Sequence, residues 1–232
     1  MSEASRAAVF VHGAGGGGWE WGVWARVFEA ERYIVAAPDL RPGPQGLAAT
    51  QLADYAGQVA QWLAAARQRG PAGVVLVGAS LGGLLALGQA DAADALVLVN
   101  PLSPSGLPAA LPMPEVMPWG REATLAGTRH ALPDADDLAA LYAFRRWRDE
   151  SGLALGQARA GRELPRPRCP VLVLASDGDL DVPPAASAAL ADALGASLLR
   201  LPGSHVGPLL GRQAADAAAL AVEWLNGLPA HA

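Results

Sequence analysis

A serine lies in a tight, glycine-flanked turn at residues 77–83, V-G-A-S-L-G-G, between an apolar stretch and a stretch with helical spacing. This is the pattern G-x-S-x-G at a strand-to-helix turn, where larger neighbours would collide. Such a turn lifts the serine hydroxyl clear of the backbone, beside the positive end of the following helix. We therefore predict that Ser80 is a nucleophile. The alternative is a glycine-rich turn in which Ser80 only caps a helix.

A serine nucleophile needs a base to accept its proton and an acid to hold that base in the right tautomer. His205 is the candidate base, because it follows the last predicted strand and so lies at the same sheet edge as Ser80. The alternative role for His205 is capping of the final helix. The loop after the preceding strand offers three carboxylates. Asp179 is the candidate acid, and Asp177 and Asp181 are the fallbacks.

The other three histidines have different expected roles. His130 lies in a proline-rich segment, and His231, next to the last residue, is expected to be frayed. His12 ends the first predicted strand, and we expect it to brace the glycine run that follows rather than to act as a base. Glycines allow the backbone to approach a substrate closely. The N–H groups of Ala14 and Leu81 are therefore predicted to form an oxyanion hole, where a developing negative oxygen is stabilised.

The same glycine run supports a rival interpretation. Gly13-x-Gly15-x-x-Gly18 follows a predicted strand and precedes a helix, and Asp39 ends the next strand about 20 residues later, as in a dinucleotide-binding fingerprint. Against it, four consecutive glycines satisfy many patterns, and Trp19 would crowd a pyrophosphate. It also leaves the serine, acid and base unexplained.

Short apolar runs alternate with stretches of helical spacing along the chain. Predicted strands cover Ala7–Val11, Tyr33–Ala37, Gly73–Val77, Ala95–Val99, Pro170–Ala175 and Ser197–Leu201, and predicted helices cover Trp19–Arg32, Thr50–Arg69, Leu81–Ala90, Pro183–Leu194 and Arg212–Leu228. Apolar runs without strict alternation suit strands covered on both faces. The pattern predicts an α/β fold, with a parallel sheet between two layers of helices.

The alternation fails once, between residues 101 and 168. Prolines crowd the first part, and a helical patch follows from Asp134 to Glu150. Almost 70 residues without a sheet strand is too long for an ordinary connection. We predict a core formed by residues 1–100 and 169–232, with residues 101–168 inserted as a cap.

These features together resemble the α/β-hydrolase superfamily over nearly the whole chain. Around residues 9–14 (V-F-V-H-G-A), Trp19, Trp21 and residues 37–40 (A-P-D-L), the sequence is similar to the small-ester esterase and hydroxynitrile lyase branch. The resemblance implies an α/β-hydrolase fold with Ser80, His205, Asp179, Ala14 and Leu81 in the roles given above. It also implies about six strands, because the two N-terminal strands common in the superfamily are missing. At position 79 this sequence has alanine, where many relatives have histidine.

The cap is expected to form the substrate pocket. The candidate substrate-binding residues are Trp19, Met117, Trp119, Tyr142 and Phe144, with packing of the cap onto the core as the alternative role. A run of arginines, Arg145, Arg146 and Arg148, predicts a solvated helix face, with binding of a substrate carboxylate as the alternative.

Composition narrows the class of function. The 232 residues have a net charge of −5 and a pI near 5.3, and all 17 basic residues are arginine, so lysine-based chemistry is excluded. Clustered positive charge is absent, so we expect neither a nucleic-acid nor a membrane partner. With no signal peptide or apolar stretch of membrane length, we expect a cytoplasmic monomer or homodimer without cofactor or metal.

The sequence therefore predicts a serine hydrolase that cleaves a small carboxylic ester or thioester through an acyl-enzyme. A C–C bond hydrolase or lyase using the same site, and a small-molecule-binding protein without catalysis, remain the alternatives.

Overall fold

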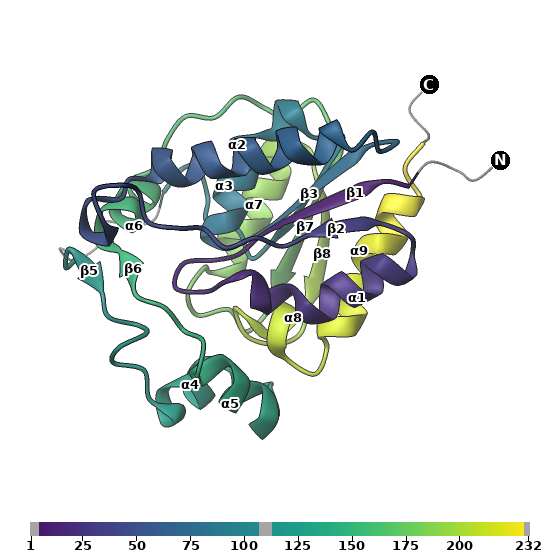
Figure 1. Ribbon diagram of the computed structural model, residues 1–232. Coiled ribbons are helices and arrows are strands. Elements are labelled where there is room, and N and C mark those ends of the chain that lie inside the picture. Colours follow the sequence, from purple (N-terminus) through teal and green to yellow (C-terminus); the bar gives the residue numbers. More distant parts are fainter. Residues whose placement is uncertain (1–4, 107–112, 230–232) are drawn as a thin grey trace.

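The centre of the molecule is a six-stranded sheet in the order β2-β1-β3-β4-β7-β8 (Figure 1). The computed structural model describes residues 5–106 and 113–229. The strands are β1 (Ala7–Val11), β2 (Ile34–Ala36), β3 (Val74–Ala79), β4 (Ala95–Val99), β7 (Val171–Ser176) and β8 (Ser197–Leu201). Every neighbouring pair is parallel, so all these strands end at the same edge. The predicted α/β class and the six strands are confirmed.

Helices cover both faces of the sheet. The helices of the described chain are α1 (Gly22–Ala30), α2 (Leu52–Gln68), α3 (Leu81–Leu87), α4 (Leu125–Ala131), α5 (Asp137–Phe144), α6 (Gly152–Arg159), α7 (Pro184–Leu194), α8 (Gly207–Leu210) and α9 (Ala214–Asn226), with short 3-10 turns at Gly18–Trp21, Leu47–Ala49 and Ala90–Ala92. In Figure 1, α2, α3 and α7 lie on one face, and α1, α8 and α9 on the other. Within the described residues, no helix combines the length and the apolarity that a membrane crossing needs.

Successive side chains of β1 point to opposite faces of the sheet, and both faces are covered by helices, which explains why its sequence is continuously apolar. Val9 and Val11 pack toward α2, α3 and α7, whereas Phe10 packs into an aromatic cluster with Trp21 and Phe28 on the α1 and α9 side. All five β1 residues are buried. Because both faces of the strand meet side chains, no polar residue interrupts it before His12.

The segment between β4 and β7 lies beyond the carboxyl ends of the strands (Figure 1). It contains a short antiparallel pair, β5 (Val116–Met117) with β6 (Glu150–Ser151), and the helices α4, α5 and α6. The predicted helix from Asp134 to Glu150 is wrong in its extent, because α5 ends at Phe144. The residues after it hydrogen-bond to the glycine loop instead of continuing the helix. The division into core and cap stays a prediction.

Candidate active site

Ser80 lies at the sharp turn between β3 and α3, with φ 54° and ψ −119°. Positive φ is strained for a residue with a side chain and persists only where the surroundings enforce it. Here the Ser80 N–H donates to Val99 O at 3.0 Å and Ser80 O accepts from Leu102 N–H at 3.0 Å. A Cβ atom at Gly82 would overlap the carbonyl oxygens of Val11 and His12. The glycine after the serine is therefore a steric requirement of the turn, as the sequence pattern predicts.

The glycine loop after β1 adjoins this turn, since a Cβ atom at Gly13 would lie 3.2 Å from Ser80 Cβ. Four of the five N–H groups from residue 14 to residue 18 donate within the protein: Gly15 to Glu150 Oε2 (2.9 Å), Gly16 to Gly13 O (3.3 Å), Gly17 to Glu20 Oε2 (3.2 Å) and Gly18 to Asp39 Oδ1 (2.8 Å). Among the described residues, the N–H groups of Ala14 and Leu81 have no such acceptor. One of these donors follows Ser80 directly and the other follows Gly13, which adjoins Ser80.

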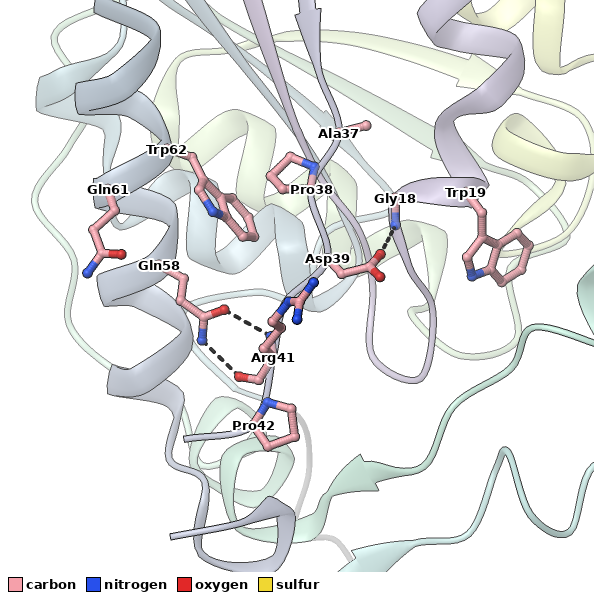
Figure 2. A pocket seen from close by; sticks show the side chains of 10 residues that line it. All are labelled: Gly18, Trp19, Ala37, Pro38, Asp39, Arg41, Pro42, Gln58, Gln61 and Trp62. Atoms are coloured by element: carbon pink, nitrogen blue, oxygen red, sulfur yellow. Dashed lines mark hydrogen bonds between the residues drawn. The ribbon is translucent and has the colours of Figure 1, made fainter. Parts of the chain in front are cut away.

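The same hydrogen bonds argue against the dinucleotide interpretation. N–H groups that would hold a pyrophosphate are already bonded to carboxylates, and a buried Glu20 side chain lies against the loop. Figure 2 shows Asp39, the residue expected to bind a ribose, bonded instead to the Gly18 N–H. Bringing a phosphate to this loop would set its charge beside the carboxylates of Asp39 and Glu150.

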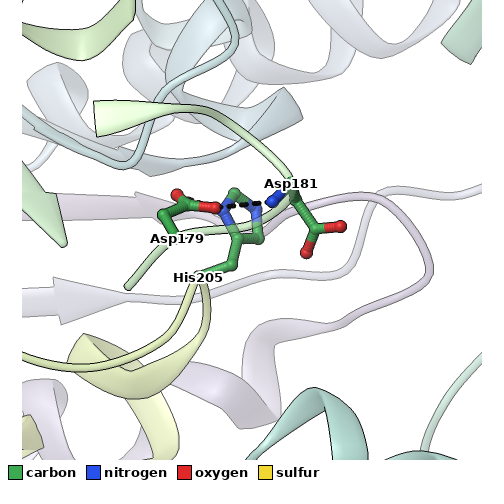
Figure 3. A group of neighbouring side chains, drawn as sticks. All are labelled: Asp179, Asp181 and His205. Atoms are coloured by element: carbon green, nitrogen blue, oxygen red, sulfur yellow. Dashed lines mark hydrogen bonds and ion pairs between the residues drawn. The ribbon is translucent and has the colours of Figure 1, made fainter. Parts of the chain in front are cut away.

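Asp179 and His205 form a direct pair after β7 and β8. His205 Nδ1 donates to Asp179 Oδ2 at 2.7 Å, and the Asp179 side chain is only 1 % exposed. Asp179 Oδ1 accepts the N–H group of Asp181 at 2.8 Å (Figure 3). It also accepts the N–H group of Val182 at 2.8 Å. Asp177 instead pairs with Arg200 at the surface. Of the three candidate carboxylates, Asp179 is the one that orients the histidine.

The electrostatic surroundings of His205 favour its protonated form. Burial alone lowers the pKa of His205, but the hydrogen bond to Asp179 and the nearby charges of Asp179 and Asp181 outweigh it, so the pKa lies above its ordinary value. With Nδ1 donating to Asp179, Nε2 is the nitrogen that can accept a proton. The pair is thus suited to take up a proton from a neighbouring hydroxyl. The Ser80 hydroxyl forms no hydrogen bond with another described group.

Two residues that the sequence did not point to, the buried Asn100 and the half-buried Asp134, hold the His205 loop. Asn100, with φ 43° at the end of β4, donates to His205 O at 2.7 Å and to Ser176 Oγ at 2.9 Å. Asp134 accepts from the N–H and the hydroxyl of Ser204, both at 2.8 Å. Both contacts cross more than 65 residues of chain, so no local spacing signals them. His130 is exposed in α4, and His231 lies outside the described residues.

Asp179, Asp181 and His205 could each offer one ligand atom to a cation, within 4.8 Å of one another (Figure 3). Both oxygens of Asp179 and the Nδ1 atom of His205 are, however, already engaged in hydrogen bonds. A metal would have to displace these bonds. The chemistry of this donor set therefore fits an acid–base pair better than a metal centre.

His12 braces the glycine loop, as predicted. Its Nδ1 donates to Gly13 O at 2.7 Å, and its Nε2 accepts the Leu40 N–H at 2.8 Å and a guanidinium N–H of Arg148 at 3.1 Å. Burial lowers the pKa of His12 from 6.5 to about 4. The ring is therefore neutral at physiological pH and serves as a structural hydrogen-bonding group.

This burial makes stability depend on pH. The unfolded chain protonates His12 near pH 6.5 and the folded protein only near pH 4, so the stability that the neutral ring contributes is complete above pH 6.5 and lost toward pH 4. A His12→Gln variant keeps an acceptor for Leu40 but does not titrate. The difference in free energy of unfolding between wild type and variant should shrink by about 3 kcal/mol between pH 7 and pH 4. Urea denaturation at each pH measures it, and a constant difference would contradict a neutral, buried His12.

Glu20 changes the free energy of unfolding with pH in the opposite direction from His12. Burial raises the pKa of Glu20 from 4.5 to about 8, so the folded protein holds a proton there at neutral pH. Its contribution makes the free energy of unfolding decline as the pH rises from 4.5 toward 8. Glu20 is present in both proteins of the His12 comparison, so its effect cancels in the difference.

The candidate substrate-binding residues lie in different surroundings. Trp19 packs edge-to-face on Tyr142, with ring centroids 5.7 Å apart, and Trp119 is 41 % exposed beside Gly15. Met117 packs against the core, and Phe144 is half-buried. Their role in binding stays a prediction.

Trp19 also borders an open groove of about 740 Å³ between α2 and the segment after β2 (Figure 2). Its other lining residues are Gly18, Ala37, Pro38, Asp39, Arg41, Pro42, Gln58, Gln61 and Trp62. Ser80 and His205 are not among them, so this groove is separate from the serine and its histidine.

A parallel sheet with this strand order, a serine on a strained turn after β3, and an acid and a histidine after β7 and β8 define the α/β-hydrolase class. The sequence model described as the alpha/beta hydrolase family matches residues 8–221. The chain belongs to this family. No curated protein matches it in sequence.

Several solved structures share the fold. A methylesterase from Arabidopsis is 17% identical, with a TM-score of 0.73 over 96% of this chain and 100% of its own. A pyrethroid hydrolase from Sphingobium faniae is 21% identical, with a TM-score of 0.68 over 96% of this chain and 98% of its own. A thermophilic esterase from Thermogutta terrifontis is 19% identical, with a TM-score of 0.72 over 97% of this chain and 90% of its own.

Proposed function

We propose that this protein is a cofactor-free serine hydrolase that cleaves a small carboxylic ester or thioester through an acyl-enzyme. Ser80 is the nucleophile, His205 the general base and then acid, and Asp179 the residue that orients His205. The backbone N–H groups of Ala14 and Leu81 form the oxyanion hole. The fold alone does not carry this proposal, because α/β-hydrolase folds host many reactions.

The observation that carries the proposal is the arrangement around Ser80. The serine is held at φ 54°, and the N–H groups of Ala14 and Leu81 have no acceptor among the described residues. In the glycine loop, by contrast, the four N–H groups that follow Ala14 are all bonded. Donors left free beside a nucleophile stabilise charge that appears only in the transition state. A glycine loop with a purely structural role would have no reason to leave them unbonded.

The proposed reaction has two halves. Ser80 Oγ attacks the carbonyl carbon while His205 Nε2 takes its proton, and the oxyanion of the tetrahedral intermediate accepts the two N–H groups. Collapse releases the alcohol or thiol, which takes the proton from His205 and leaves an acyl group on Ser80. Water, deprotonated by His205, then attacks the acyl-enzyme, and the carboxylic acid leaves with Ser80 restored.

The substrate class follows from the surroundings of the site. The aromatic side chains Trp19, Trp119 and Tyr142 lie around the glycine loop and α5, which favours an apolar acyl or aromatic group. The structural relatives named as a methylesterase and as esterases are consistent with a small ester.

A covalent probe tests the proposal. A fluorophosphonate should label the wild-type protein, and peptide mass mapping should place the adduct on Ser80. Nitrophenyl esters and acyl thioesters of increasing acyl length should be hydrolysed, with the short acyl chains preferred. Absence of labelling would favour the small-molecule-binding alternative. Labelling at Ser80 with cleavage of a cyanohydrin or a diketone, and no ester turnover, would favour the C–C bond alternative.

A further inference from the structure

We propose that Arg148 and Glu150, which come from the segment between β4 and β7, are positioning residues that fix the oxyanion loop. This inference rests on the proposed function and assigns residues that neither the motif nor the sequence pattern includes. The loop in question is residues 13–18, which carries the Ala14 N–H. Both residues act on the backbone of Gly15 and Gly16, which directly follow Ala14.

Arg148 holds the loop through its backbone and its side chain. Its N–H donates to Gly15 O at 2.8 Å, and its guanidinium donates to Gly16 O at 2.6 Å. The same guanidinium donates to Leu40 O at 3.2 Å and to His12 Nε2 at 3.1 Å. Arg148 therefore connects the loop to Leu40 and to His12. The predicted solvated face is wrong for this arginine.

Glu150, the first residue of β6, holds the loop from two residues further along the same segment. Its Oε2 accepts the Gly15 N–H at 2.9 Å, while its Oε1 accepts the Tyr55 hydroxyl at 2.6 Å and the Ser151 N–H at 2.7 Å. Glu150 is only 4% exposed. A buried carboxylate with these partners is fixed in place, so it fixes the direction of the Gly15 peptide.

Steric contacts leave the loop little freedom. Gly15 has φ 69°, and a Cβ atom there would lie 2.7 Å from the Trp119 ring and 3.2 Å from Arg148 O. Trp119 and Arg148 come from the same inserted segment, on either side of α4 and α5. The peptide that follows Ala14 is thus clamped by residues more than 100 positions away in sequence.

The contacts of Arg148, Glu150 and Trp119 with residues 15 and 16, here called the clamp, have a consequence for catalysis. An oxyanion donor is effective only when its N–H points to the place where the negative oxygen forms, and a displacement of about 1 Å can reduce the rate 100-fold. The bonds to Gly15 and Gly16 orient the peptide unit next to the Ala14 N–H. Loss of these bonds should therefore weaken transition-state binding and leave substrate binding nearly unchanged.

Glu150→Gln is a sharp test because it is isosteric. The amide oxygen can still accept from Tyr55 and Ser151, but the amide NH₂ then faces the Gly15 N–H and cannot accept from it. We expect kcat for nitrophenyl acetate to fall roughly 10- to 100-fold with KM within about 2-fold. The inhibition constant of a trifluoromethyl ketone, whose adduct places an oxyanion in the hole, should rise by the same factor as kcat falls.

Tyr55→Phe is the matched control. It also removes one hydrogen bond to Glu150, but it leaves the bond to Gly15 intact. Because the Ser151 N–H still holds Oε1, Glu150 keeps its position, and this variant should keep kcat and the inhibition constant near wild-type values. Wild-type kcat in a folded Glu150→Gln protein, or a raised KM with unchanged kcat, would overturn the proposal.

A second variant covers the case in which Glu150→Gln does not fold. Arg148, whose side chain is 36% exposed, should tolerate replacement by methionine, and Arg148→Met should lower kcat in the same way. The control Arg129→Met removes an exposed ion pair with Asp137 in the same inserted segment. Equal activities of these two methionine variants would overturn the proposal.

Amide hydrogen exchange tests the contacts of Arg148 and Glu150 with the loop independently of the proposed hydrolase activity. The peptide covering residues 13–18 should exchange about 10-fold faster in Glu150→Gln than in Tyr55→Phe. This readout needs no turnover. Failure of the wild type to react with esters or probe would refute the hydrolase, whereas unchanged exchange in an active protein would refute the clamp.

Discussion

Replacing Ser80 by alanine is expected to lower kcat for ester hydrolysis by a factor on the order of 10⁴ to 10⁶ and to abolish fluorophosphonate labelling. Without the hydroxyl, no acyl-enzyme forms, and His205 has only water to activate. The residual rate should come from the free N–H groups of Ala14 and Leu81, which still stabilise an oxyanion. Initial rates with nitrophenyl acetate and a labelling gel measure both effects.

The variant should fold normally, because alanine keeps the Cβ atom and the hydroxyl forms no hydrogen bond within the described protein. Ser187→Ala is the matched control. Its hydroxyl is buried in α7 without a hydrogen-bond partner, so its removal should leave both kcat and stability nearly unchanged. A Ser80→Ala protein with more than about a tenth of the wild-type kcat would show that another nucleophile acts.

Asp179→Asn is expected to lower kcat about 10⁴-fold while the protein stays folded. The amide oxygen of the new side chain can still accept hydrogen bonds from the N–H groups of Asp181 and Val182. The amide NH₂ then points toward His205 Nδ1. Two donors cannot face each other, so the imidazole moves its proton to Nε2. In that tautomer His205 cannot accept the proton of Ser80.

Asp177→Asn controls for the charge of the loop, since Asp177 pairs only with exposed Arg200 and should keep kcat within a few-fold of wild type. Thermal denaturation checks that both variants are folded. The assignment of the acid is wrong if Asp179→Asn retains wild-type turnover, or if Asp181→Asn loses as much activity as Asp179→Asn.

Much of the fold is encoded in short stretches of sequence. The strands at Ala7–Val11 and Ala95–Val99 have the predicted bounds, because buried parallel strands need continuous apolar runs. The edge strand Ser197–Leu201 also has the predicted bounds, although it is mostly outside the core. The turn at Ser80 is equally local, since its small neighbours are required by backbone contacts within a few residues or with the adjacent strand. Sequence also placed Asp179 and His205 at one edge of the sheet, because parallel strands share that edge.

Other predictions failed where local patterns are ambiguous. The helix predicted to reach Glu150 ends at Phe144, and α6 (Gly152–Arg159) was not predicted, because two glycines weaken its helical pattern. The three arginines near residue 146 look alike in sequence. Only their different neighbours in space separate Arg148, which holds the glycine loop, from Arg146, which lies over the Tyr142 ring.

The sequence by itself determined the α/β class and the sheet edge at which Ser80, Asp179 and His205 lie, because these depend on periodicity and on short motifs. Only the tertiary structure decided which of three carboxylates meets His205 and which side chains hold the loops. Asn100, Asp134 and Glu150 act across 105, 70 and 135 residues of chain, respectively. Hydrogen bonds between such distant residues depend on how the layers pack, and packing leaves no spacing pattern in a single sequence.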